Sequence, residues 1–139
     1  MQDGKEESQR LMDSVLPFAE EMLTKHGEFF PYGGAITMNG DIVSVAADNG
    51  EEQPPSAELI SILQNSFKSA ADNGTYRATA LVNDVRIQLS SGELSDALAI
   101  ELDHQSGYSV IVYLPYSLED GQVQYGQISA SAGKGNVFH

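Results

Sequence analysis

The chain has 139 residues, 41% of them hydrophobic, and contains no cysteine. This composition predicts one hydrophobic core and a single domain over residues 1–139, with flexible ends at about 1–5 and 131–139. The absence of cysteine excludes disulfides, thiolate metal sites and cysteine nucleophiles, and it is typical of a reducing compartment. No apolar stretch has the length of a signal-peptide core near Met1 or of a membrane span, so we expect a cytoplasmic protein.

Twenty acidic residues against seven lysines and arginines give a net charge of −13. Phosphate backbones and anionic lipid headgroups would be repelled, so we expect neither a nucleic acid nor a membrane as a partner. The same charge would attract a basic protein partner. The alternative explanation is that the acidic surface only keeps the protein dissolved.

The first element expected is a helix from about Glu6 to Lys25, because apolar residues recur every three or four positions along it. Pro17 falls inside this helix and should bend it. In an alternative interpretation the helix begins at Ser14, so that Pro17 lies in its first turn. Gly27 is the expected terminator.

The segment from His26 to Ile36 has the sequence HGEFFPYGGAI and leads into two short strands at about 34–38 and 41–46. Asn39-Gly40 between the strands predicts a hairpin with a type I′ turn, in which both central residues have positive φ. Gly33 and Gly34 are also interpreted as positions of positive φ, where the chain enters the sheet. An acidic loop is expected over 47–55.

A second helix is expected from Ser56, which would cap it, to about Asp72. Strands are expected at 76–89, 97–104, 108–116 and 123–130, because these segments are rich in strand-forming residues and short turns separate them. The predicted fold class is therefore α+β, in the order α-β-β-α-β-β-β-β, with two helices packed on one face of a mainly antiparallel sheet.

This order of elements is similar to that of profilin-like and roadblock-type domains, which also run helix, hairpin, helix and three strands. Those families usually close with a further helix, where this chain has a strand and a tail. In addition, the HGEFFPYGGAI segment, with Leu114-Pro115-Tyr116 and Tyr125-Gly126-Gln127, resembles small uncharacterised bacterial proteins. The roadblock-type resemblance implies a homodimeric scaffold, and the bacterial group carries no assigned activity to transfer.

Residue types suited to catalysis are sparse. The histidines are His26 at a helix end, His104 at a hairpin end and the terminal His139, and neither a nucleophile motif nor a phosphate-binding loop is present. Glu101 and Asp103 project from the same strand face and could form a hard-metal site with His104, but a solvated acidic surface is the favoured expectation. We predict no catalytic residues, no bound metal and no cofactor.

The residues predicted to contact a ligand are aromatic and acidic. Six aromatic residues would form one cluster if the first hairpin packs near the last two strands: Phe29, Phe30, Tyr32, Tyr113, Tyr116 and Tyr125. Core packing is the favoured expectation for this cluster, but Tyr32 and Tyr116 each stand beside a proline in a strand-terminal turn and are expected to be half exposed. The candidate binding residues are Tyr32, Tyr116, Tyr125, Glu101, Asp103 and His104.

These features predict a non-enzymatic, acidic, cytoplasmic protein-binding domain. A bacterial immunity or antitoxin-type inhibitor of a basic partner fits this description, because carboxylates facing a basic toxin would speed the encounter and imitate a nucleic acid. Two alternatives stay open. One is a roadblock-like homodimeric scaffold, and the other is a small-ligand binder or enzyme with a pocket near Tyr32, Tyr116, Glu101 and His104.

Overall fold

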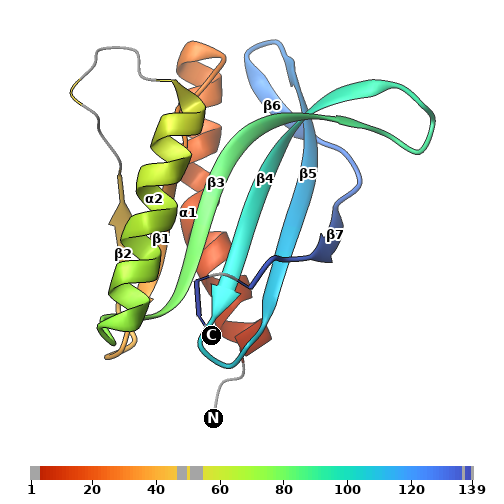
Figure 1. Cartoon of the computed structure of the whole chain (residues 1–139). Helices are drawn as coiled ribbons and strands as arrows, with labels where there is room; N and C mark the ends of the chain where they lie inside the picture. The colour runs from red at the N-terminus through yellow and green to blue at the C-terminus, as the bar shows by residue number, and fades with distance from the viewer. Residues whose placement is uncertain (1–3, 47–49, 51–54, 136, 139) are drawn as a thin grey trace.

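Two helices pack against one antiparallel sheet (Figure 1). The computed structural model of the chain describes residues 4–46, 50, 55–135 and 137–138. In chain order the elements are α1 (Gly4–His26), β1 (Tyr32–Thr37), β2 (Ile42–Val45), α2 (Ser56–Asp72), β3 (Tyr76–Gln88), β4 (Leu94–His104), β5 (Ser109–Glu119), β6 (Gln122–Tyr125) and β7 (Ser129–Ala132). The predicted α+β class is confirmed, as is the order of helix, hairpin, helix and then strands. The acidic loop expected over 47–55 lies largely outside the described residues.

The sheet has the order β2-β1-β3-β4-β5-β6, and β7 also pairs with β5. β6 pairs with the last residues of β5, from Tyr116 to Glu119, and β7 pairs with the earlier residues Val110 to Tyr113. Between them Pro115 has no N–H to donate, and its carbonyl accepts from the N–H of Gly126 at 2.8 Å. The single strand expected over 123–130 is therefore divided into two.

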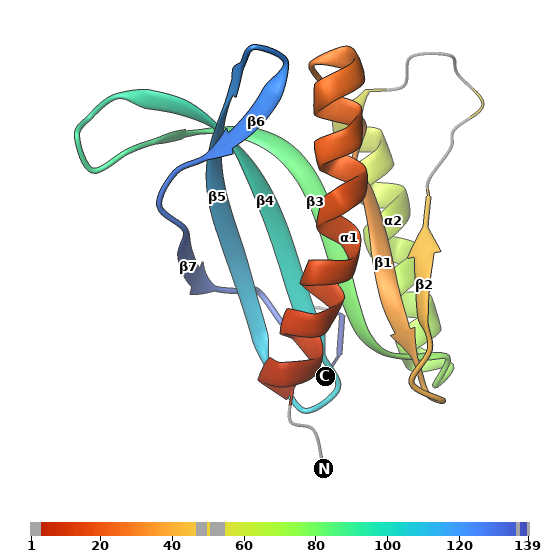
Figure 2. The same ribbon diagram turned by 180° about the vertical axis from the view of Figure 1, so that it is seen from behind.

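The two helices lie on opposite faces of the sheet, whereas both were expected on one face. Figure 1 shows α2 in front of the sheet, and Figure 2 shows α1 on the reverse side. On β3, Ala78, Ala80 and Val82 belong to the core cluster under α1, while Leu81 belongs to the cluster under α2. Successive side chains of a strand point to opposite faces of the sheet. A strand with apolar side chains on both faces is therefore stable only where another element packs on each face.

Gly33 and Gly34 allow both helices to approach β1 closely. Neither glycine has the positive φ that was expected. A Cβ atom added at Gly33 would lie 2.7 Å from the ring of Phe67 on α2, and one added at Gly34 would lie 2.6 Å from Val15 on α1. These glycines are therefore required by close packing on the two faces of the strand rather than by a turn.

The first hairpin also differs from its predicted geometry. Among the described residues only Asp120 is a non-glycine with positive φ, so Asn39 does not adopt the type I′ conformation. Gly40 has φ of 94° and donates to the carbonyl of Thr37 at 2.9 Å, while Thr37 donates to Asp41 at 2.8 Å. This is a three-residue loop that ends in a left-handed glycine, the next most common way to close a hairpin.

α1 continues through Pro17 from Gly4 to His26, so the longer of the two predicted helices forms. α2 begins at Ser56, but its N-cap position is Pro55 and no side chain caps it. The predicted capping by Ser56 is therefore wrong, because Ser56 is already inside the first turn. The carbonyl of Pro55 accepts from the N–H groups of Glu58 and Leu59, at 3.1 and 3.2 Å.

Beyond β7, Gly133, Gly135 and Val137 contact the rest of the fold. Gly133 donates its N–H to the carbonyl of Ser109 at 3.0 Å, and Gly135 donates to the Ser109 hydroxyl at 3.1 Å. Val137 is buried beside Leu63, Phe67 and Leu81. This hydrophobic contact completes the smaller core cluster, on the α2 face.

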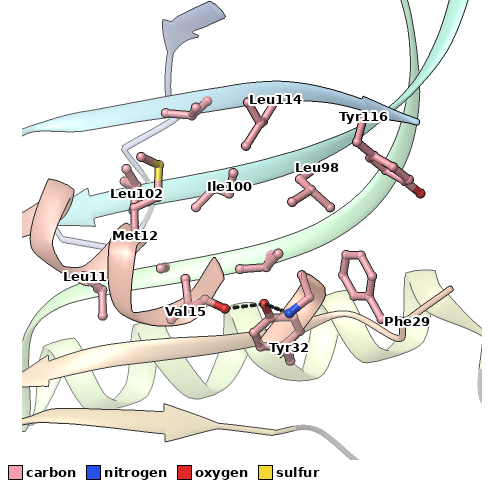
Figure 3. Close-up of a cluster of buried hydrophobic side chains, with 14 of the residues drawn as sticks. Leu11, Met12, Val15, Phe29, Tyr32, Leu98, Ile100, Leu102, Leu114 and Tyr116 are labelled. Carbon is pink, nitrogen blue, oxygen red and sulfur yellow. Dashed lines mark hydrogen bonds between the residues drawn. The ribbon is translucent and has the colours of Figure 1, made fainter. Parts of the chain in front are cut away.

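The larger core cluster lies between α1 and the sheet (Figure 3). Tyr32 of β1 reaches into α1, where its hydroxyl donates to the carbonyl of Val15 at 2.6 Å and accepts from the N–H of Ala19 at 3.1 Å. In a regular helix these two backbone groups would bond to each other, four residues apart. Pro17 lies midway between Val15 and Ala19 in the chain. Helices commonly bend at a proline or where a side chain enters the backbone hydrogen bonding.

We expect Tyr32→Phe to lower the free energy of unfolding by about 2 kcal/mol, because two buried backbone groups lose their partner. Urea unfolding followed by circular dichroism measures this loss. The matched control is Tyr113→Phe, which removes a hydroxyl that makes no hydrogen bond within the described residues and should cost less than about 0.5 kcal/mol. Equal effects of the two substitutions would contradict the structural role of the Tyr32 hydroxyl.

Candidate functional site

The six candidate binding residues do not share one site. Side chains along β4 and β5 alternate between the two faces of the sheet. His104 and Tyr116 lie on the α1 face, which they share with Tyr32. Glu101 and Asp103 lie on the α2 face, beside Phe67 and Val137. A single pocket near Tyr32, Tyr116, Glu101 and His104 is therefore not formed, because the sheet separates Glu101 from the other three.

Tyr32 and Tyr116 are buried, with 9% and 7% of their surface exposed, and not half exposed as expected. The Tyr116 hydroxyl donates to Asp84 at 2.8 Å. Burial raises the pKa of both tyrosines, and for Tyr116 the hydrogen bond to Asp84 raises it further. Both hydroxyls are thus held as neutral donors inside the fold, where they fix neighbouring elements rather than meet a ligand.

The predicted aromatic cluster forms in part. Phe29, Tyr32 and Tyr116 belong to one core cluster, and the rings of Phe29 and Tyr32 meet edge to face at 5.7 Å. The ring of Phe18 on α1 also meets the Tyr32 ring edge to face, at 4.7 Å. Tyr113 points to the other face of the sheet, because it is three residues from Tyr116 on β5 and side chains alternate between the faces.

A buried charged cluster, absent from the sequence prediction, joins the first turn of α1 to β3 and β4. The carboxylate of Glu7 pairs with Arg77 and accepts a hydrogen bond from His104 Nε2 at 2.8 Å. His104 Nδ1 accepts from the N–H of Ser106 at 3.0 Å, so the proton of the neutral ring lies on Nε2. Burial alone would raise the pKa of Glu7, but hydrogen bonds from His104 and Arg77 hold it below its ordinary value.

The sequence contained a signal for this burial. Glu7 stands four residues before Leu11 in the i, i+4 series that continues through Val15, Ala19 and Leu23, all of which are buried. A charged residue in the first turn is usually assigned to the surface, and its distant partners Arg77 and His104 could not be identified without the fold.

Ser106, His104 and Glu7 form a line of serine, histidine and acid. Ser106 Oγ lies 3.0 Å from His104 Nδ1, a distance suited to proton transfer. The lone pair of Nδ1 also receives the Ser106 N–H, however, and Glu7 is held by Arg77. Gly4 is buried directly against Ser106 Oγ. The arrangement therefore joins α1 to the turn between β4 and β5 and does not present an activated nucleophile.

Glu101 and Asp103 border a cavity of ≈ 30 Å³ under α2, which has room for water but not for an organic ligand. Burial raises the pKa of both carboxyls; the charge of Asp103 adds to this for Glu101, while a hydrogen bond from Ser109 partly offsets it for Asp103. Within the described residues no three His, Asp or Glu side chains gather as metal ligands.

A hollow of ≈ 460 Å³ on the surface beside α1, here called the aromatic pocket, is the strongest candidate site. Its lining comes from the second half of α1, the segment before β1 and the end of β2: Phe18, Met22, His26, Glu28, Phe29, Phe30, Pro31, Tyr32 and Ala46. Phe18 and Phe30 are 47% and 48% exposed. Exposed aromatic rings around a hollow are typical of protein-binding surfaces.

Carboxylates stand near the aromatic pocket. Glu28 is part of its lining, and Glu20 of α1 lies close enough to the half-exposed Tyr125 to add to the rise in its pKa that burial causes. Burial raises the pKa of Asp84, and the hydrogen bond from Tyr116 offsets part of this rise. The negative charges of Asp96 and Glu28 raise the pKa further. The negative potential of this region would be relieved by a bound cation.

A larger hollow, of ≈ 590 Å³, lies between the turn joining β3 to β4 and the segment from β6 to β7. Serine and glutamine supply half of its lining, including Gln88, Ser95 and Gln124. Two of the predicted binding residues, Tyr116 and Tyr125, also line it, whereas four aromatic residues line the aromatic pocket. Large desolvated aromatic anchors carry most of the energy at protein interfaces, so we place the candidate site at the aromatic pocket.

No known protein family, curated protein or solved structure matches the chain. The resemblances to profilin-like domains, roadblock-type domains and small bacterial proteins therefore stay predictions. Neither helix of the described residues is long and apolar enough to cross a lipid bilayer.

We expect Glu7→Gln to lower the free energy of unfolding by about 3 kcal/mol at pH 7, because it leaves Arg77 without its buried partner. The pKa of Glu7 is lower in the folded chain than its ordinary 4.5, so its contribution is present above about pH 4.5 and lost as the pH falls through the folded-state pKa. The difference between the native chain and the variant should therefore shrink at acidic pH.

Urea unfolding at pH 7 and at the lowest pH where both proteins fold measures this change. Glu21→Gln is the control, because Glu21 pairs with Lys25 on the exposed side of the same helix and its loss should leave the free energy of unfolding nearly unchanged at both pH values. A difference that is independent of pH would show that the Glu7 carboxylate is not stabilised by its buried partners.

Proposed function

We propose that this chain is a non-enzymatic, acidic, cytoplasmic domain that binds a basic protein, in the manner of a bacterial immunity or antitoxin-type inhibitor. The observation that carries the proposal is the distribution of charge. The few basic side chains mostly face acids of the same chain, in the pairs Arg10–Glu7, Lys25–Glu21, Lys68–Asp72, Arg77–Glu7 and Arg86–Asp96. Lys134 lies close enough to Glu101 to oppose, in part, the rise in its pKa that burial causes.

Because most of the bases are paired within the chain, much of the charge of −13 rests on carboxylates at the surface of the described residues. Glu28 and Glu20 are among them, and both stand by exposed aromatic side chains. Like charges on a surface repel one another and are relieved by a cationic partner, which they also attract over a Debye length of about 8 Å in physiological salt. Steering of this kind raises the rate of association more than it slows dissociation.

The proposal predicts an association rate that depends steeply on salt. For a complex with the protein encoded by a neighbouring gene, where inhibitors and their targets are commonly placed together, the rate constant should fall about 10-fold between 50 and 500 mM NaCl in stopped-flow measurements. Replacing Glu20 and Glu28 by Gln should lower the rate at low salt by several fold and flatten this dependence.

The matched control replaces Glu93 and Glu119 by Gln, which removes the same charge from two exposed positions outside the aromatic pocket. This variant should lose much less of the rate. A rate that does not respond to salt, or equal losses in the two variants, would remove the electrostatic basis of the proposal.

A homodimeric scaffold is the second candidate function, and the edge strand β2 favours it. β2 ends the sheet and carries only Ile, Val and Ser, with 37% of Ile42 exposed. Uncharged edge strands readily pair with another strand, including one from a second copy. This candidate predicts a dimer in light scattering, about twice the chain mass of 15.0 kDa, that Val43→Lys converts to monomer. A monomer at all concentrations would exclude it.

A further inference from the structure

The floor of the aromatic pocket is held rigidly by the core. Phe29 and Tyr32 are 8% and 9% exposed, and the Tyr32 hydroxyl is fixed by its two bonds to α1 (Figure 3). Phe18 and Phe30 stand above this floor, with about half of each side chain still in water. A ligand that enters such a hollow gains contact with apolar surface without the cost of first ordering the site.

The size of the pocket suits a side chain rather than a whole domain surface. Its ≈ 460 Å³ lies within the range of about 300–1,000 Å³ that encloses a compact ligand. A leucine, phenylalanine or tryptophan with its own backbone would fit in this volume. Protein interfaces are commonly centred on one such anchor, buried in a pocket and surrounded by a polar rim.

The charges beside the pocket favour a cation next to that anchor. Glu28 belongs to the lining and has Asp84 within its electrostatic range. The nearby cation Lys25 is already paired with Glu21 at 2.7 Å. An incoming arginine would also be suited to the aromatic rings, since its planar guanidinium binds carboxylates and stacks on rings of this kind.

We infer that the aromatic pocket binds one large apolar side chain of the basic partner, and that an arginine or lysine close to that side chain in the partner's sequence binds Glu28. This inference rests on the proposed function, because it identifies the part of the basic protein that the domain contacts. It places Phe30 at the centre of the interface and Glu28 at its rim.

Selection from a random 12-residue peptide library displayed on phage tests this inference without knowledge of the partner. The full chain, biotinylated and immobilised, is the bait, and the selected peptides are synthesised and measured by fluorescence polarisation. They should share a large apolar residue within four positions of an arginine or lysine. Phe30→Ala should weaken their binding about 30-fold, and Glu28→Gln about 3- to 10-fold.

Leu94→Ala and Glu93→Gln are the matched controls. Leu94 is an exposed apolar side chain, at 67%, in the hairpin of β3 and β4, so its loss should leave binding unchanged. Urea unfolding of each variant separates a loss of binding from a loss of folding; Phe30 is half exposed, so its replacement should leave the unfolding midpoint nearly unchanged. The inference is overturned if no peptide is enriched, if the enriched peptides lack the basic residue, or if folded Phe30→Ala binds them as the native chain does.

Measurement of the same variants against the full-length partner distinguishes the two proposals. If Phe30→Ala keeps a tight, salt-dependent complex, the proposed function holds and the basic protein docks elsewhere. If the pocket binds the selected peptides but no basic protein forms a complex, the pocket stands as a peptide site and the proposed function fails.

Discussion

The hydroxyl of Tyr32 lies inside the hydrogen-bond ladder of α1, between the carbonyl of Val15 and the N–H of Ala19. This interaction joins the longer helix to the strand β1. β1 lies between the edge strand β2 and β3, so it links β2 to the rest of the sheet. Pro17 lies between these two residues in the chain, and the tyrosine hydroxyl bonds to the backbone groups on either side of it. The arrangement of Phe18 and Phe29 around the Tyr32 ring, and hence the floor of the aromatic pocket, follows from this anchor.

At its N-terminal end α1 is held by charge. Glu7 is buried with His104 and pairs with the partly exposed Arg77, so the first turn of the helix is tied to strands that lie far along the chain. Removal of one member would leave an unpaired buried charge, which costs more than a lost surface ion pair. The helix is thus fixed at its first turn and near its middle, and its aromatic and acidic side chains project from this support at the proposed binding surface.

Much of the fold could be predicted because its signals are local. The i, i+4 series in α1 and the alternation in the long strands require only neighbouring residues, and these elements formed near the expected bounds. The errors concern residues whose role depends on distant contacts. Gly33 and Gly34 were assigned to a turn, but they are needed where Val15 and Phe67 approach β1 from opposite faces. The candidate site was predicted only in part: Tyr32 lines the aromatic pocket, while the exposed Phe30 was expected in the core and the exposed Phe18 was not among the candidates.

By itself the sequence determined the elements, their order and the acidic character of the chain, because propensity, periodicity and charge are properties of the residues and their near neighbours. Only the tertiary structure decided which face each helix covers and which aromatic rings stay in water. It also decided that Glu7 and His104 meet inside the protein while Glu101 is placed across the sheet. These outcomes depend on contacts between segments up to about a hundred residues apart, which no local pattern specifies.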